Sequence, residues 1–176
     1  AFTPLIVLNN ASRDPFYFGW SSNLDFLFAR HFEICMNMWG YPNSGWQNEF
    51  AFGVVGKFFN SIPLYGNNSI LLGALVRVAD APVRIYSGDV DEKNGIGGGL
   101  FATVRTPGLN VGVDASMMYD GCMFMKAGLG LQYSITDRAC FNASASYMHG
   151  FGLAGSMGND SMRFVAGLAS KGVSDI

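Results

Sequence analysis

The sequence predicts an all-β fold: a transmembrane, up-and-down antiparallel β-barrel of about ten strands, whose lumen is filled by polar side chains. Three observations predict this fold. Apolar residues recur at every second position along successive segments, which is the period of a β-strand. Only 14% of the 176 residues are charged, against about 25% in a typical soluble domain. No apolar run reaches the roughly 18 residues that mark a transmembrane helix.

The length and the charge narrow the possible classes further. A chain of this length fits one domain, residues 1–176. An aromatic content of 14% is too high for a disordered chain. A net charge of −2 gives no basic footprint, so we expect no nucleic-acid partner.

The first three predicted strands cover residues 2–8, 16–28 and 32–38. Residues 2–8 are apolar and provide a strand that ascends before the next one, although Pro4 is better suited to an edge or a strand start. Residues 16–28 alternate far beyond the roughly 5–6 residues usual for a soluble strand. Residues 32–38 place Phe, Ile and Met on one face and His, Glu, Cys and Asn on the other.

The next three predicted strands cover residues 50–58, 70–78 and 96–105. Each alternates aliphatic or aromatic residues with glycine and single charges. The last four strands cover residues 109–117, 123–135, 139–147 and 162–168, where the alternation is cleanest. On the apolar faces of the nine strands from residue 16 onward, the only positions that are not apolar are Ser22, Gly56 and Gly98, and no position on these faces is charged.

The less apolar faces of these strands indicate whether the apolar faces point to a soluble core or to lipid. A soluble sandwich presents a water-facing side rich in Lys, Glu and Thr. Here that side holds Gly, Ser, Asn and Ala with isolated charges, and small residues suit the crowded interior of a narrow barrel. We therefore expect the apolar faces to meet lipid. A soluble barrel or sandwich with an unusually bland surface is the alternative.

The isolated charges on the second faces nearly balance in sign. Enclosed ions need such a balance, because an unpaired buried charge is very costly. We expect a lumen charge network that ties the strands together and closes the lumen. Its members are Asp25, Glu33, Glu49, Lys57, Arg77, Arg105, Asp114, Lys126 and Arg163. In the alternative, the same charges line a narrow path for ions or small solutes, and neutralising Arg77, Arg105 or Lys126 changes its conductance.

The links between the strands alternate in length. Short turns fall at 29–30, 106–108 and 136–137, and longer polar links at 40–47, 80–94, 118–122 and 149–160. The polar link at 60–69 interrupts this pattern. An even strand count, which is usual in bacterial barrels, gives ten, or eight if two segments are loops. Residues 83–90 are a candidate hairpin above the membrane.

Residues 127–147 carry a family resemblance. A Gly-x-Gly-x-x-Tyr strand from Gly128 to Tyr133 leads through the Thr136-Asp137 turn into a second strand that ends at Tyr147. This segment resembles the hairpins of small bacterial outer-membrane barrels, the OmpA/OmpX/OmpW-like group. The resemblance implies a porin-like protein of the cell envelope in the bacterial outer membrane. The lipid bilayer would be its partner, with other membrane or envelope proteins as further candidates.

Candidate catalytic residues are few. Small barrels include enzymes that act on lipid or peptide through a Ser, His and acid set. His31 and His149 are the two histidines, and His149 is predicted at a rim near Ser146, Ser156, Asp160 and Ser161. Nothing in the spacing shows the required hydrogen-bond reach, so we expect no enzyme, no cofactor and no metal site. The expected role is structural, anchoring or partner-binding, and a rim-located enzyme is the last alternative.

Three cysteines, Cys35, Cys122 and Cys140, are an odd number without metal-ligand spacing. We expect at most one disulfide among them.

Overall fold

The computed structural model describes residues 2–9, 16–28, 30–42, 48–78, 84–87, 89–92, 96–119, 123–151 and 160–170. All regular structure in these residues is β-strand. In these same ranges, no helix has the length and apolar character required to span a membrane.

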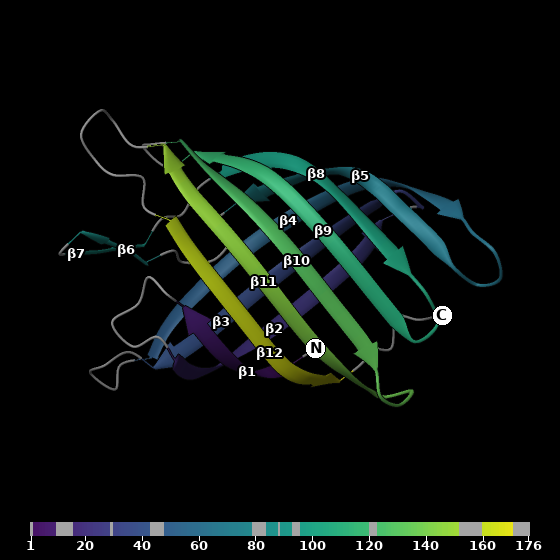
Figure 1. Ribbon diagram of the computed structural model, residues 1–176, viewed down its shortest axis with the longest axis horizontal. Coiled ribbons are helices and arrows are strands. Elements are labelled where there is room, and N and C mark those ends of the chain that lie inside the picture. The colour runs from purple at the N-terminus through teal and green to yellow at the C-terminus, as the bar shows by residue number, and fades with distance from the viewer. Residues whose placement is uncertain are drawn as a thin grey trace.

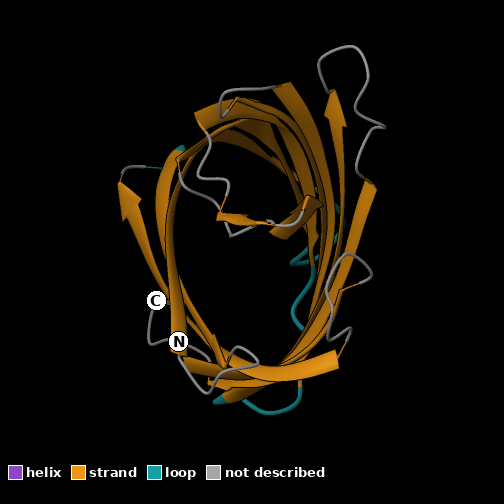
Figure 2. Cartoon of the chain, turned by 90° about the vertical axis from the view of Figure 1, so that its left-hand side faces the viewer, coloured by secondary structure: helices purple, strands orange, loops and turns teal. Residues whose placement is uncertain are grey.

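Ten strands form one closed antiparallel barrel in which neighbours in the chain are neighbours in space (Figures 1 and 2). They are β1 (Phe2–Asn9), β2 (Phe16–Phe28), β3 (Phe32–Pro42), β4 (Asn48–Pro63), β5 (Ser69–Val78), β8 (Ile96–Arg105), β9 (Leu109–Tyr119), β10 (Met123–Ser134), β11 (Ala139–Phe151) and β12 (Asp160–Ser170). The barrel closes where β1 pairs with β12, with Leu5 opposite Gly167. The prediction of ten strands is confirmed, and the alternative of eight is wrong.

A separate hairpin lies in the link between β5 and β8. It consists of β6 (Arg84–Ser87) and β7 (Asp89–Glu92), which pair only with each other. It lies at the end of the barrel opposite the short turns (Figure 1). The candidate hairpin at residues 83–90 is thereby confirmed, with its strands slightly shifted.

The link predicted at 60–69 is shorter in the structure than expected. β4 continues to Pro63, which pairs with Ser69, so only residues 64–68 form the turn. The turn is closed by a bond from the Leu64 amide to the Asn68 carbonyl at 2.8 Å. Gly66 supplies the left-handed backbone that this tight turn needs, with φ of 69°. Polar composition predicted a loop, but cross-strand pairing extended the hairpin instead.

The apolar faces point outward, as predicted. Along β5 the exposed outer positions alternate with less exposed inner ones, and large exposed apolar side chains also occur on β2, β3, β4 and β8 to β12. The outer surface includes Leu24, Phe26, Phe28, Phe58, Leu72, Val76, Leu100, Val104, Val113, Leu129, Leu131, Phe164 and Leu168. Such a continuous apolar band is what a bilayer requires of a barrel exterior.

The interior is more apolar than the predicted polar lumen. Cys35, Val55 and Leu75 form a buried cluster on the inner wall, and Phe101 packs against it. Phe59, Leu71, Met118 and Phe124 are also buried on the inner face. These residues belong to the mixed faces of their strands. One part of the lumen wall is therefore an apolar core, while polar and charged residues occupy the rest.

Candidate functional site in the barrel lumen

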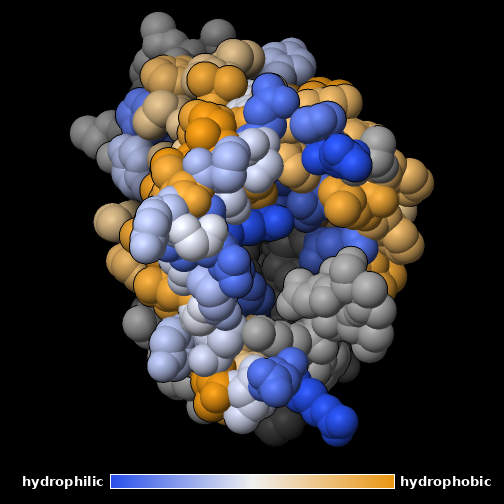
Figure 3. All heavy atoms as spheres, turned by 90° about the vertical axis from the view of Figure 1, so that its right-hand side faces the viewer, coloured by the Kyte–Doolittle hydropathy of each residue, from blue (hydrophilic) through white to orange (hydrophobic). Residues whose placement is uncertain are grey.

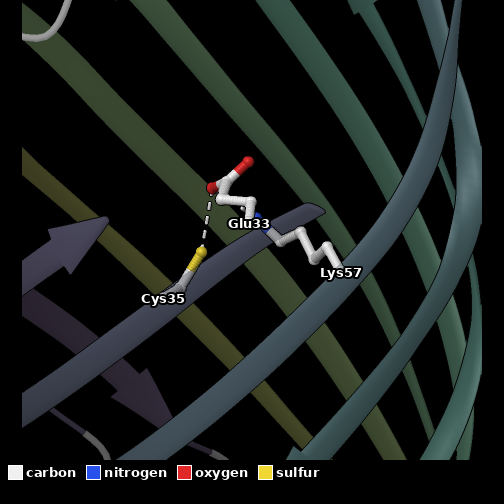
Figure 4. Close-up of polar contacts among 3 residues, drawn as sticks. All are labelled: Glu33, Cys35 and Lys57. Atoms are coloured by element: carbon white, nitrogen blue, oxygen red, sulfur yellow. Dashed lines mark hydrogen bonds and ion pairs between the residues drawn. The ribbon is translucent and has the colours of Figure 1, made fainter. Parts of the chain in front are cut away.

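A first group of charges lies where β2, β3 and β4 adjoin. Strand pairing sets Glu33 opposite Lys57 and Cys35 opposite Asp25. Lys57 Nζ donates to Glu33 Oε1 at 3.3 Å, and the Cys35 thiol donates to the same oxygen at 2.9 Å. Figure 4 shows the three side chains of Glu33, Cys35 and Lys57 converging from two neighbouring strands. One carboxylate oxygen thus accepts two donors.

Asp25 borders this group from β2. A carboxylate oxygen of Asp25, one of Glu33 and the Cys35 sulfur all lie within 4.8 Å of one another. Two carboxylates and a thiol are possible ligands for a divalent metal. Lys57 already balances the charge of Glu33, however, and a buried thiol is a poor ligand until it loses its proton. The expectation of no metal site stays a prediction.

A second ion pair joins β5 to β9 across the intervening strand β8. Arg77 on β5 is only 8% exposed, and its Nη2 donates to Asp114 Oδ2 on β9 at 2.6 Å. The intervening strand β8 carries Gly97 opposite Arg77 and Phe101 opposite Asp114. The Asp114 carboxylate lies over Gly128 on β10, where an added Cβ would come within 2.6 Å of Oδ1. Gly128 thus leaves room on β10 for the Asp114 carboxylate.

Both ion pairs run along the barrel wall. Glu33 and Lys57 are on adjacent strands, and Arg77 and Asp114 are on strands separated only by β8. Each pair therefore links strands on the same side of the barrel, and neither pair reaches across the lumen to the opposite wall.

The other predicted network members are placed differently. Asp25 and Arg105 are exposed, and Lys126 is half-buried on β10. The side chains of Glu49 and Arg163 lie outside the described residues. The structure thus joins Glu33 to Lys57 and Arg77 to Asp114, with Asp25 beside the first pair.

A polar ladder that the sequence reasoning did not single out crosses the wall farther along. Asn110 Nδ2 donates to Gln132 Oε1 at 3.0 Å, and Gln132 Nε2 donates to the Cys140 sulfur at 3.5 Å. The Cys140 thiol lies 3.7 Å from the Ala169 carbonyl oxygen. The ladder links β9 to β12. Its signal in the sequence was the recurrence of polar side chains on the inner faces.

Part of the lumen is accessible to solvent. Asp25 on β2 and Ser144 on β11 point inward by strand alternation, and both are exposed. From the end that carries the short turns, hydrophilic side chains surround a hollow in the molecular surface (Figure 3). The interior therefore combines a packed wall with accessible polar space.

The cysteines among the described residues are reduced. Cys35 and Cys140 are buried free thiols, and Cys122 lies outside the described residues. Burial in strand walls explains why each behaves as a small apolar side chain with a weak donor.

The histidines have structural surroundings. His31 Nδ1 lies 3.0 Å from the Phe59 carbonyl oxygen, and the Phe59 amide donates to the His31 carbonyl at 2.9 Å. His149 packs edge-on against Phe151 and is paired in register with Asp160. Ser146 lies three residues away and so faces the opposite side of the sheet. Ser156 lies outside the described residues.

Comparison with known proteins supports the fold. No protein-family model matches the chain, and no curated protein matches its sequence. Among solved structures, the NanC porin is similar with a TM-score of 0.51 and 10% identity, covering 97% of this chain and 100% of that chain. Outer membrane phospholipase A from Escherichia coli is similar with a TM-score of 0.45 and 12% identity, covering 97% of this chain and 90% of that chain.

The likeness to the NanC porin confirms the predicted membrane β-barrel fold. Outer membrane phospholipase A is an enzyme by its name, which contradicts the expectation that the chain is not an enzyme. That expectation rested on the absence of a catalytic spacing in the sequence. At 12% identity the likeness concerns the fold and assigns no activity to this chain.

Proposed function

We propose that the protein is a narrow outer-membrane channel for ions or small hydrophilic solutes. The observation that carries this proposal is the direction of the lumen ion pairs. Glu33 pairs with its neighbour Lys57, and Arg77 pairs with Asp114 across one strand, so both pairs follow the wall. The inward-facing Asp25 and Ser144 remain exposed. A lumen with braced walls and accessible polar groups is suited to conduction.

The size of the barrel sets the expected bore. Interior room grows with strand number, and a barrel of about eight strands is just filled by its side chains. Ten strands leave more room, and the cluster of Cys35, Val55, Leu75 and Phe101 takes up part of it. The channel is therefore narrow, and the apolar cluster forms part of its wall.

The second candidate is a structural or anchoring role with a closed lumen. The apolar cluster favours it, because packed side chains such as Leu75, which is 2% exposed, exclude water from their part of the interior. In this role the ion pairs stabilise the wall, and binding takes place at the rims or on other envelope proteins. The two candidates differ in whether the purified barrel conducts.

Conductance of the purified protein in a planar bilayer tests the proposal. We expect small, discrete openings. Their single-channel conductance should change measurably in Arg105→Gln, since Arg105 is exposed at the last position of β8. Arg138→Gln is the matched control, because Arg138 is an exposed arginine in the turn between β10 and β11. A silent bilayer, with insertion verified by protection from protease, would contradict the channel and favour the closed barrel.

A further inference from the structure

A row of side-chain amides crosses the inner wall on three consecutive strands. Strand pairing sets Asn110 on β9 opposite Gln132 on β10, and Gln132 opposite Asn142 on β11. All three lie on the inner faces of their strands by alternation, and the row spans two strand spacings, about 10 Å. Asn110 is the second residue of β9, so this amide row lies close to the end of the barrel that carries the short turns. Hydrophilic side chains surround a hollow at that end (Figure 3).

Much of the hydrogen-bonding capacity of the amide row is unused within the described chain. Asn110 Nδ2 donates to Gln132 Oε1, and Gln132 Nε2 donates to the Cys140 sulfur. These bonds leave the Asn110 oxygen and one N–H on each of the two amides. Asn142 makes no hydrogen bond with the described residues, and its Oδ1 is buried although the side chain as a whole is partly exposed. A buried polar atom without a protein partner is a place where water or a polar ligand binds.

The wall beside the amide row is bare. Gly130 lies on the same face of β10, two positions from the row, and a Cβ there would meet nothing within 4 Å. Strand pairing sets Gly130 opposite Ser144 on β11, and the Ser144 side chain is exposed. The next inner position of β10 is Gly128, over which the Asp114 carboxylate lies. The bare wall at Gly130 is therefore bordered by amides, a hydroxyl and a carboxylate.

We propose that this surface, the amide row together with Gly130 and Ser144, binds a neutral polyhydroxylated solute such as a sugar. The inference rests on the proposed channel for the route by which the solute arrives. A hydroxyl group both donates and accepts hydrogen bonds, as a carboxamide and a serine do, so each solute hydroxyl finds a matching group on the surface. A glycine floor lets the ring of the solute approach the backbone closely.

The charges around this surface favour a neutral solute over an acidic one. The Asp114 carboxylate is balanced by Arg77, whose Nη2 lies 2.6 Å away. A carboxylate on a solute at Gly130 would adjoin that of Asp114, and like charges repel. Arg105 stands opposite Asn110 at the end of the row, but it is exposed, and water and salt screen its charge.

Sugar binding to the full chain in a detergent without a sugar headgroup tests this proposal. Methyl glucoside is titrated while saturation-transfer NMR follows the bound fraction. We expect saturable binding with a Kd on the order of 1 mM, as suits a small polar ligand. Methyl glucuronide, which differs by one carboxylate, should bind at least about fivefold more weakly. Absence of saturable binding would mean that water alone occupies the amides, and tighter binding of the glucuronide would overturn the choice of a neutral solute.

Two variants and a matched control locate the site. Asn142→Leu should weaken binding of methyl glucoside about fivefold, because it removes the carboxamide at a similar side-chain size. Gly130→Leu should abolish binding, because its side chain covers the bare wall. Gly150→Leu is the control, since Gly150 also has nothing within 4 Å of an added Cβ but lies on β11 toward the other end of the barrel. Unchanged binding in both variants, or equal losses in Gly130→Leu and the control, would overturn this location.

The binding measurement does not depend on conduction, so the two proposals fail separately. A bilayer that conducts, together with a chain that binds no sugar, overturns the sugar site and leaves the channel. A silent bilayer together with saturable sugar binding that is lost in Gly130→Leu supports the site and overturns the channel.

Discussion

Arg77 and Asp114 illustrate how single residues in this barrel depend on distant strands. Their sequence positions are 37 residues apart, yet their charged atoms lie 2.6 Å apart on the inner wall. Arg77 retains 10% of its side-chain exposure and Asp114 retains 25%. A guanidinium with so little access to water needs an anion beside it, because removing one member of a buried pair leaves an uncompensated charge.

Asp114→Asn should therefore destabilise the barrel by about 3 kcal/mol, since it leaves the Arg77 charge without its nearby carboxylate. Urea unfolding from lipid vesicles, followed by tryptophan fluorescence, measures this change. Asp25→Asn is the control and should shift stability by less than about 0.5 kcal/mol, because Asp25 is exposed. Equal losses in the two variants would contradict a special role for the Arg77 pair.

Sequence reasoning predicted the inward position of these charged residues but not their partners. Strand alternation places Arg77 and Asp114 on one face, and this depends only on local spacing. Which cation meets which anion depends on the stagger of β5, β8 and β9. The prediction of a polar link at 60–69 was wrong for a related reason, because the pairing of Ile62 with Ile70 depends on a neighbouring strand and not on local composition.

At the scale of strands, glycines on the inner face fall into two kinds. A Cβ at Gly99 would lie 2.0 Å from the Ala115 carbonyl oxygen and 2.6 Å from the Ser116 Cα, so the backbone of β9 would have to move. At Gly130 on β10 a Cβ would meet nothing within 4 Å. Two glycines in similar sequence surroundings therefore differ in whether the structure has room for a side chain.

We predict that Gly99→Ala destabilises the folded barrel by about 1–3 kcal/mol, the usual cost of forcing atoms into a packed wall. Gly130→Ala should change stability by less than about 0.5 kcal/mol. The shift in electrophoretic mobility between folded and heat-unfolded protein reports the folded fraction during a urea titration. If both variants fold equally well, the close approach of β8 and β9 is not a constraint.

At the scale of the whole molecule, the exterior is one apolar band and the interior is divided. The band was predictable because outer positions repeat at a strict period of two. The division of the lumen was not, since Phe59, Leu75, Met118 and Phe124 are inward residues whose burial depends on which strands from other segments lie beside them. Prediction from pattern thus succeeds where a single rule applies along the chain and fails where strands from different segments meet.

Replacing a residue in the middle of the band tests whether it faces lipid. Leu100 is 70% exposed near the centre of β8, and Leu100→Arg should lower the stability in vesicles by about 2–4 kcal/mol. Tyr65→Arg is the control, because Tyr65 is 96% exposed in a turn at the rim, where the cost is about 0–1 kcal/mol. Equal stability of the two variants would mean that water surrounds the band.

The self-contained pairing of β6 and β7 has a consequence for engineering. The barrel ladder joins β5 directly to β8, from Ser69 opposite Arg105 to Val78 opposite Ile96, and it takes no hydrogen bond from the hairpin. Foreign sequence exchanged for residues 84–92 would leave every rung of that ladder in place. The rim opposite the short turns is thereby a natural position for grafting an epitope or a reporter peptide, with the ten-stranded wall acting as its carrier.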